Sequence, residues 1–118
     1  MNLQIFGTRK CHETRRAEMF FKERRIPYQF IDLAEKGISQ GELRSVQASI
    51  PLDQLIDTEG KEYERRNLKY LRFDKEKTLL NYPLLLKTPV VRDGNRATVG
   101  YCSDVWKEWI QADQKRTE

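Results

Sequence analysis

The sequence predicts an α/β fold in which a four-stranded mixed sheet is flanked by helices. Three observations lead to this prediction. Near the N-terminus, two short apolar segments are joined by an amphipathic helical segment, as in a right-handed βαβ unit with parallel strands. The middle of the chain is polar and helical in pattern. The C-terminal part has the pattern of a β-hairpin followed by an amphipathic helix.

The bulk composition limits the classes of protein that need to be considered. At 118 residues the chain can bury one core, so we expect a single domain over 1–118. No apolar run approaches the roughly 20 residues of a membrane helix, and the N-terminus has no apolar signal region, so we expect a soluble cytoplasmic protein. The 22 basic and 18 acidic residues mostly alternate, which argues against direct nucleic-acid binding.

The N-terminal βαβ unit has clear boundaries. A strand is predicted over 2–6, and Gly7 then lets the backbone turn. Pro27 ends the following helix, and the aromatic and β-branched run 28–33 predicts the second strand. The apolar side chains of the helix recur at helical spacing and should face the core: Ala17, Phe20 and Phe21.

The segment 39–82 is predicted to be a mostly helical insertion within the domain. Ser39 and Glu42 have the spacing of a capping box, which predicts a helix start. Pro51 either closes that helix or opens another one.

The second half of this insertion is less clearly patterned. A turn is predicted over 58–61, and 62–73 fits no single type of element. Asp74 is positioned to cap a further helix that carries Leu79 and Leu80.

A β-hairpin pattern follows the insertion. The apolar run 84–91 is interrupted by Pro89, and 93–95 supplies residues that tolerate positive φ before the apolar run 97–99. Because proline cannot donate a ladder hydrogen bond, Pro89 is expected at the first position of the strand, where its peptide bond can be cis.

The last helix is expected to be capped by Ser103 or Asp104, with fraying over 114–118. Its predicted inward face consists of Val105, Trp106, Trp109 and Ile110. Together the elements give the order of a thioredoxin-like fold, with a mixed sheet covered by helices.

Cys11 is the candidate nucleophile, because it lies where the first strand turns into the first turn of a helix. Free backbone N–H groups and the helix dipole there favour thiolate over thiol. Nearby cations are expected to add to this effect: Arg9, Lys10, Arg15 and Arg16. The alternative is that Cys11 is a small buried hydrophobe.

Metal chemistry is not expected. The chain has two cysteines, far apart in sequence, and one histidine, which is neither a zinc-binding pattern nor a disulfide framework. Because neighbouring helical residues point about 100° apart, His12 should lie on the surface rather than act as a base for Cys11.

Several segments together resemble a known family. They are Cys11 with 14–17, the strand 28–33, the run 81–91 and the triplet 99–101. The chain resembles the glutaredoxin-related arsenate reductase family, which also contains the Spx-like transcriptional regulators. This resemblance implies a thioredoxin-like fold with a helical insertion, a nucleophilic cysteine, and a cis proline facing that cysteine.

The chain departs from the arsenate-reducing members at three positions. Those members place arginines where this sequence has Asp57, Thr88 and Tyr101, although Arg15 matches the arginine that follows the cysteine loop. A tetrahedral oxyanion needs cationic bidentate donors, and a carboxylate repels it. We therefore expect arsenate to be a poor substrate.

The chain also departs from the Spx-like regulators. The resemblance to these regulators implies a CxxC switch. Thr14 occupies the second cysteine position, and a hydroxyl can stabilise a thiolate but cannot form a disulfide. Gly100, Tyr101 and Asp104 nevertheless resemble the regulator branch, so a non-catalytic regulator that binds RNA polymerase or another protein remains the alternative function.

The function that the sequence favours is that of a thiol-dependent oxidoreductase with one nucleophilic cysteine. Cys11, supported by Thr14 and Arg15, would attack a disulfide, and an external thiol would resolve the intermediate. No bound cofactor is expected; glutathione would be a co-substrate, or a small redox protein the partner. Cys102 is a candidate resolving thiol. The expected substrate-binding residues are Lys10, Thr88, Pro89 and Tyr101.

Overall fold

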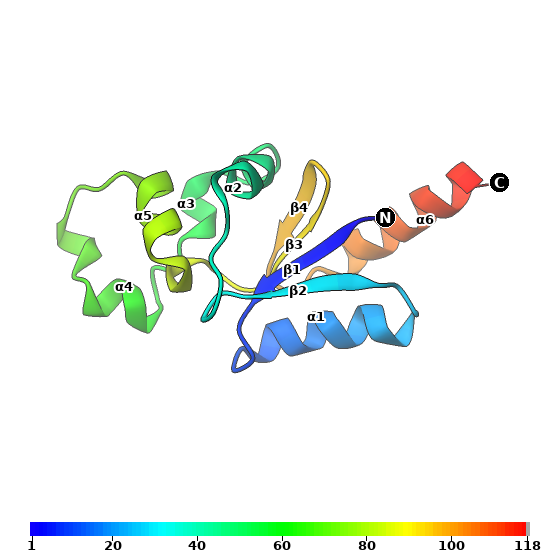
Figure 1. Cartoon of the computed structure of the whole chain (residues 1–118), viewed down its shortest axis with the longest axis horizontal. Coiled ribbons are helices and arrows are strands. Elements are labelled where there is room, and N and C mark those ends of the chain that lie inside the picture. The colour runs from blue at the N-terminus through cyan, green and yellow to red at the C-terminus, as the bar shows by residue number, and fades with distance from the viewer. Residues whose placement is uncertain (118) are drawn as a thin grey trace.

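Four strands form one mixed sheet in the order β2-β1-β3-β4 (Figure 1). The computed structural model describes residues 1–117. β1 pairs parallel with β2 and antiparallel with β3, and β3 pairs antiparallel with β4. The strands are β1 (Leu3–Gly7), β2 (Tyr28–Asp32), β3 (Val90–Asp93) and β4 (Arg96–Val99). The predicted thioredoxin-like α/β fold is confirmed.

Helices cover both faces of the sheet. The alternation of β1 sends Leu3 and Ile5 to one face, where they pack with α1 (His12–Glu23) and α6 (Ser103–Thr117), and Phe6 to the other. The predicted inward face of α1 is confirmed, because its three apolar residues are all buried: Ala17, Phe20 and Phe21.

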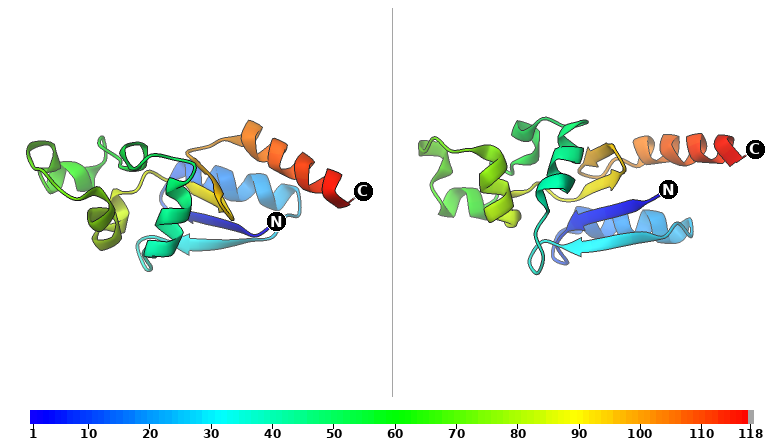
Figure 2. Two further views of the ribbon diagram at one scale, coloured as in Figure 1. Left: turned by 90° about the horizontal axis from the view of Figure 1, so that it is seen from above. Right: turned by 45° about the horizontal axis from the view of Figure 1, so that its top comes forward.

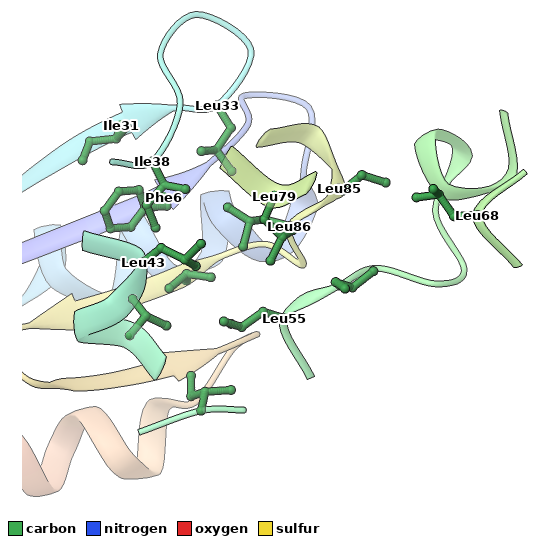
Figure 3. Packing of buried hydrophobic residues seen from close by; sticks show 14 residues of the cluster. Phe6, Ile31, Leu33, Ile38, Leu43, Leu55, Leu68, Leu79, Leu85 and Leu86 are labelled. Carbon is green, nitrogen blue, oxygen red and sulfur yellow. The ribbon is translucent and has the colours of Figure 1, made fainter. Parts of the chain in front are cut away.

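The opposite face carries α2 and the helices that follow it. Short helical elements lie beyond one end of the sheet, so the molecule is elongated, with extents of 52 × 27 × 22 Å (Figure 2). Leucine side chains from these elements join Phe6 and Ile31 of the sheet in one buried cluster (Figure 3). The elements are α2 (Gln40–Gln47), α3 (Leu52–Leu55), α4 (Lys61–Arg65), η1 (Leu68–Tyr70), α5 (Lys75–Asn81) and η2 (Pro83–Leu85).

Both predicted helix caps in this region are present. Ser39 Oγ accepts a hydrogen bond from the Glu42 N–H at 3.1 Å, and the Glu42 carboxylate accepts one from the Ser39 N–H at 2.9 Å. Asp74 Oδ1 accepts from the Lys77 N–H at 3.0 Å. Each bond satisfies a backbone donor that the first turn of a helix leaves free.

The remaining boundaries of this region differ slightly from the sequence-based ones. α2 ends at Gln47, and Pro51 is the N-cap of α3, so the proline opens a new helix. The predicted turn over 58–61 is one residue too long, because Gly60 caps α4 and Lys61 is already helical. The unassigned segment 62–73 contains the rest of α4 and the 3₁₀-helix η1.

The C-terminal helix corrects two expectations. Neither Ser103 nor Asp104 caps it: the Trp106 N–H donates to the Cys102 carbonyl at 3.1 Å, so Cys102 holds the capping position. Val105 is 37% exposed rather than inward, because the face that meets the sheet is centred on Trp106 and Trp109. The helix extends to Thr117, through most of the segment that was expected to fray, and the fraying stays a prediction; residue 118 lies outside the described part.

Residues 1–117 contain neither a helix of the membrane-spanning type nor a candidate metal-binding cluster. None of their helices combines the length and the apolar character needed to cross a membrane. Their histidine, cysteine and acidic side chains do not gather into a group of three or more that could hold a metal ion.

Gly7, at the end of β1, is expected to be intolerant of any side chain. A Cβ at this position would lie 2.4 Å from Thr14 Oγ1 and Cγ2, and both residues are buried, so the neighbour cannot move aside. Gly7→Ala should therefore lower the free energy of unfolding by about 1–3 kcal/mol, measured by urea denaturation. Gly41→Ala is the matched control.

A Cβ at Gly41, in α2, meets nothing within 4 Å. That substitution should leave stability unchanged or raise it by about 0.5–1 kcal/mol, because alanine is the better helix former. Equal effects of the two substitutions would show that Gly7 and Thr14 are not tightly packed.

Candidate active site

Cys11 lies in the loop between β1 and α1, where it is the N-cap of α1. The sequence placed it in the first turn; the structure puts it one residue earlier, since the Arg15 N–H donates to the Cys11 carbonyl at 3.2 Å as the first helical bond. The Cys11 N–H donates to the Thr8 carbonyl at 3.2 Å, which fixes the loop. This position brings the sulfur close to the free N–H groups at the start of the helix.

Thr88 contacts the sulfur from the segment that precedes β3. Its hydroxyl donates to Cys11 Sγ at 3.1 Å, and its carbonyl lies 3.8 Å from the same sulfur. The Thr88–Pro89 peptide bond is cis, as the resemblance implied. The substrate-binding role expected for Thr88 stays a prediction; the structure shows its hydroxyl as a direct hydrogen-bond partner of the candidate nucleophile.

Thr14, in the first turn of α1, is completely buried. Its methyl and hydroxyl groups pack against the backbone of Gly7, where no Cβ would fit. Thr14 Oγ1 has no full hydrogen bond to any described group, although the hydroxyl is close enough to the sulfur to favour its charged form. Cys11 thus has two threonine hydroxyls near it, one from α1 and one from the segment that precedes β3.

These neighbours change the acidity of Cys11. Partial burial raises the pKa of its thiol, but the hydroxyls of Thr14 and Thr88 and the backbone N–H groups of Thr14 and Glu13 outweigh that effect. The pKa of Cys11 is therefore below its ordinary value. Because the thiolate is the nucleophilic form, a larger share of the protein is reactive at neutral pH.

The cations expected to acidify Cys11 are not the cause of this shift. Arg9 pairs with Asp32 at 3.6 Å and lies over the Phe30 ring, and Arg16 pairs with Glu13 at 3.5 Å. Lys10 and Arg15 are exposed, and their side chains have no hydrogen-bond or ion-pair partner among the described residues. The sequence revealed the charges but not their partners. His12 is exposed, as expected.

Tyr101 lies in the loop between β4 and α6. The Arg16 guanidinium carbon is 4.0 Å from the centre of the Tyr101 ring, and Trp106 meets the ring edge-on at 5.2 Å. The Gly100 N–H donates to the Pro89 carbonyl at 2.8 Å. This loop is therefore fixed both to α1 and to the segment that carries Thr88.

Cys102 differs chemically from Cys11. Its thiol donates to the Val99 carbonyl at 3.3 Å, and burial, only partly opposed by Thr98, raises its pKa. Both cysteines are free. Cys102 is thus mostly a neutral thiol at neutral pH, and a resolving role for it stays a prediction.

Asp57 is the third position at which the arsenate-reducing members have an arginine. It belongs to the loop between α3 and α4. Its N–H donates to the Leu85 carbonyl at 2.8 Å, and its carboxylate accepts from the Glu59 N–H at 3.3 Å. Asp57 therefore has a local structural role in the insertion. A carboxylate at this position supplies no donor for an oxyanion.

A family model described as the ArsC family matches residues 6–109, a span that contains Cys11, Thr14, Thr88, Pro89 and Tyr101. The chain belongs to the ArsC family. The resemblance inferred from the sequence is thus confirmed.

Two curated relatives and one solved structure show what this ArsC-family chain is similar to. It is 29% identical to the uncharacterized protein YusI of Bacillus subtilis over 92% of its own length and 98% of YusI. It is 28% identical to the global transcriptional regulator Spx 2 of Oceanobacillus iheyensis, over 93% and 84% of the two chains. A solved ArsC-family-related structure from Bacteroides fragilis superposes with a TM-score of 0.78 at 20% identity, covering 92% and 97%. This last likeness concerns the fold.

The Thr88 hydroxyl should control the acidity of Cys11. Thr88→Val keeps the shape of the side chain and removes the donor, so the pH midpoint for alkylation of Cys11 by iodoacetamide should rise. At pH 7 the rate should fall roughly several-fold, as expected for a lost hydrogen bond to a charged group. A Cys102→Ser background ensures that only Cys11 is measured.

Thr78→Val is the control for this substitution. Thr78 is a partly buried threonine of α5 whose side chain makes no described hydrogen bond, so the midpoint should stay where it is in the parent. An unchanged midpoint in Thr88→Val would mean that the 3.1 Å contact does not stabilise the thiolate.

Proposed function

We propose that this protein is a thiol-dependent oxidoreductase that uses Cys11 as its only nucleophile and an external thiol as reductant. The observation that carries the proposal is the contact of 3.1 Å between the Thr88 hydroxyl and the sulfur of a partly exposed Cys11. Hydrogen bonds that favour the thiolate are what nucleophilic cysteines need and what a buried structural cysteine lacks.

The proposed reaction is the reduction of a mixed disulfide between glutathione and another thiol. The Cys11 thiolate attacks the glutathione sulfur, a Cys11–glutathione disulfide forms, and the substrate S–S bond breaks to release the substrate as a thiolate. A second glutathione thiolate then attacks this intermediate. Glutathione disulfide leaves, the Cys11 thiolate is restored, and the released substrate takes up the proton that the second glutathione lost.

The substrate would be bound by side chains that have no described hydrogen-bond or ion-pair partner in the resting protein. The Lys10 and Arg15 side chains have no described partners and could pair with the carboxylates of glutathione. The Pro89 carbonyl is already used by Gly100, so main-chain pairing with a substrate would rely on the Thr88 backbone. Tyr101 would form the wall of the site on the side of α6.

The same residues support a disulfide rather than arsenate as the substrate. An arsenate site needs several cations around the sulfur to hold a tetrahedral oxyanion. Here the corresponding positions carry a hydroxyl at Thr88, an aromatic ring at Tyr101 and a carboxylate at Asp57. A disulfide carries no charge on its reacting sulfur atoms and does not require those cations.

The alternative is a non-catalytic regulator that binds RNA polymerase or another protein. Its support is the likeness to Spx 2, which is named a global transcriptional regulator, together with the regulator-like Gly100-Tyr101 pair and Asp104. A pure binding protein does not need an activated thiolate at Cys11. Turnover that depends on Cys11 therefore separates the two functions.

The test is the removal of glutathione from a glutathionylated model peptide, with reduced glutathione in excess. Turnover should be measurable in the parent protein and should fall to the uncatalysed rate in Cys11→Ser. Cys102→Ser should retain turnover, because the reductant is external; loss of activity in that variant would instead assign Cys102 as the resolving thiol.

Arsenate is the second substrate in the same assay and should be reduced no faster than in the absence of protein. An absence of Cys11-dependent turnover with the peptide would contradict the proposal and leave the regulator as the better function. Rapid arsenate reduction would show that cations other than those at the expected positions serve the site.

A further inference from the structure

The Thr14 hydroxyl is an unusual feature of this site in the reduced protein. Thr14 is completely buried, its Oγ1 has no full hydrogen bond among the described residues, and buried hydroxyls are normally paired because an unpaired one destabilises the fold. The packing of Thr14 is also specific, since it occupies the volume that any Cβ at Gly7 would need. The hydroxyl is also close enough to the Cys11 sulfur to help stabilise its thiolate.

We propose that Cys11 is a site of reversible oxidation by peroxides, and that the Thr14 and Thr88 hydroxyls hold the sulfenic acid that forms there. The bond made is between Cys11 Sγ and one peroxide oxygen, and the O–O bond breaks. The thiolate sulfur loses two electrons, and the other oxygen leaves as hydroxide and takes up a proton to become water.

The geometry favours this product for three reasons. Oxygen is a stronger hydrogen-bond acceptor than sulfur, so an oxygen added to Cys11 can accept the hydrogen bond that Thr14 lacks. The Thr88 hydroxyl, already 3.1 Å from the sulfur, can donate to the same oxygen. Hydrogen peroxide is also small enough to reach a sulfur that is only partly exposed.

The sequence around Cys11 keeps this product from being consumed at once. Position 14 is a threonine, so a disulfide within the first turn of the helix cannot form. The sulfenic acid would persist until an external thiol condenses with it, forming a mixed disulfide and water. In this last step the inference rests on the proposed function, because the mixed disulfide is the intermediate of that reaction.

The test uses the full-length Cys102→Ser protein with equimolar hydrogen peroxide and no glutathione. Dimedone, which reacts with sulfenic acids, is added at increasing delays, and the adduct is located by peptide mass spectrometry. The expected result is one adduct, on Cys11, whose yield persists over minutes, with oxidation at least about tenfold faster than that of free glutathione at pH 7.

Thr14→Val is the decisive variant, because it keeps the β-branched shape and removes only the hydroxyl. The yield of trapped sulfenic acid should fall by about tenfold, as expected for the loss of one hydrogen bond to the sulfenic oxygen. Thr78→Val should behave like the parent. A circular dichroism melt of each variant shows whether it is folded, and Thr88→Val gives a second measurement if Thr14→Val is not.

The proposal is overturned if Cys11 oxidises no faster than glutathione, if it passes directly to the sulfinic acid, or if both Thr14→Val and Thr88→Val trap as much adduct as Thr78→Val. Failure of the peptide assay with normal sulfenic acid formation would contradict the reductase function alone. Normal peptide turnover with no trapped sulfenic acid would contradict this inference alone.

Discussion

The pairing of β1 with β3 is the constraint on which the candidate site depends. In this antiparallel pair Phe6 is opposite Val90. The loop that leaves β1 and the segment that enters β3 therefore lie at the same end of these two strands. Cys11 and Thr88, separated by 77 positions in sequence, meet there at 3.1 Å. A shift in the register of this pair by one residue would reverse the faces of the strand and separate the two side chains.

The two apolar clusters hold that register from opposite faces. On one face α1 and α6 pack Phe21 and Trp106 against the sheet, and on the other face Phe6 packs with the leucines of the insertion (Figure 3). The buried Trp106 also donates its indole N–H to Thr98 Oγ1 at 2.8 Å. The loop that carries Tyr101 is held by the same packing, because its ring contacts Trp106.

Much of the fold follows from local patterns in the sequence. The βαβ unit, the capping box at Ser39, the Asp74 cap and the hairpin are set by residues close together in the chain, and all are found. The start of α6 and the orientation of Val105 are less well predicted, because they depend on how Trp106 meets the sheet. Propensity alone does not determine such a tertiary choice.

The candidate site, like the fold, can be predicted from the sequence only where it depends on residues close together in the chain. The position of Cys11 next to free helical N–H groups can be inferred from a strand, a glycine and a helix in succession. The donors that lower its pKa cannot all be inferred in this way, because Thr88 comes from a distant segment. Nor does the sequence show that two of the nearby arginines, Arg9 and Arg16, pair with Asp32 and Glu13. The requirement for glycine at position 7 cannot be inferred from the sequence either, because it depends on how Thr14 packs against Gly7 in the folded protein.

The central claim is that the fold, rather than the residue type, makes Cys11 acidic. The most direct measurement is a pH titration of both cysteines by NMR, with carbon-13 at their Cβ atoms, since each thiol then reports on itself in one sample. The structure predicts that the pKa of Cys11 lies below its ordinary value and that the pKa of Cys102 lies above it. A Cys11 midpoint at or above that of Cys102 would contradict the account.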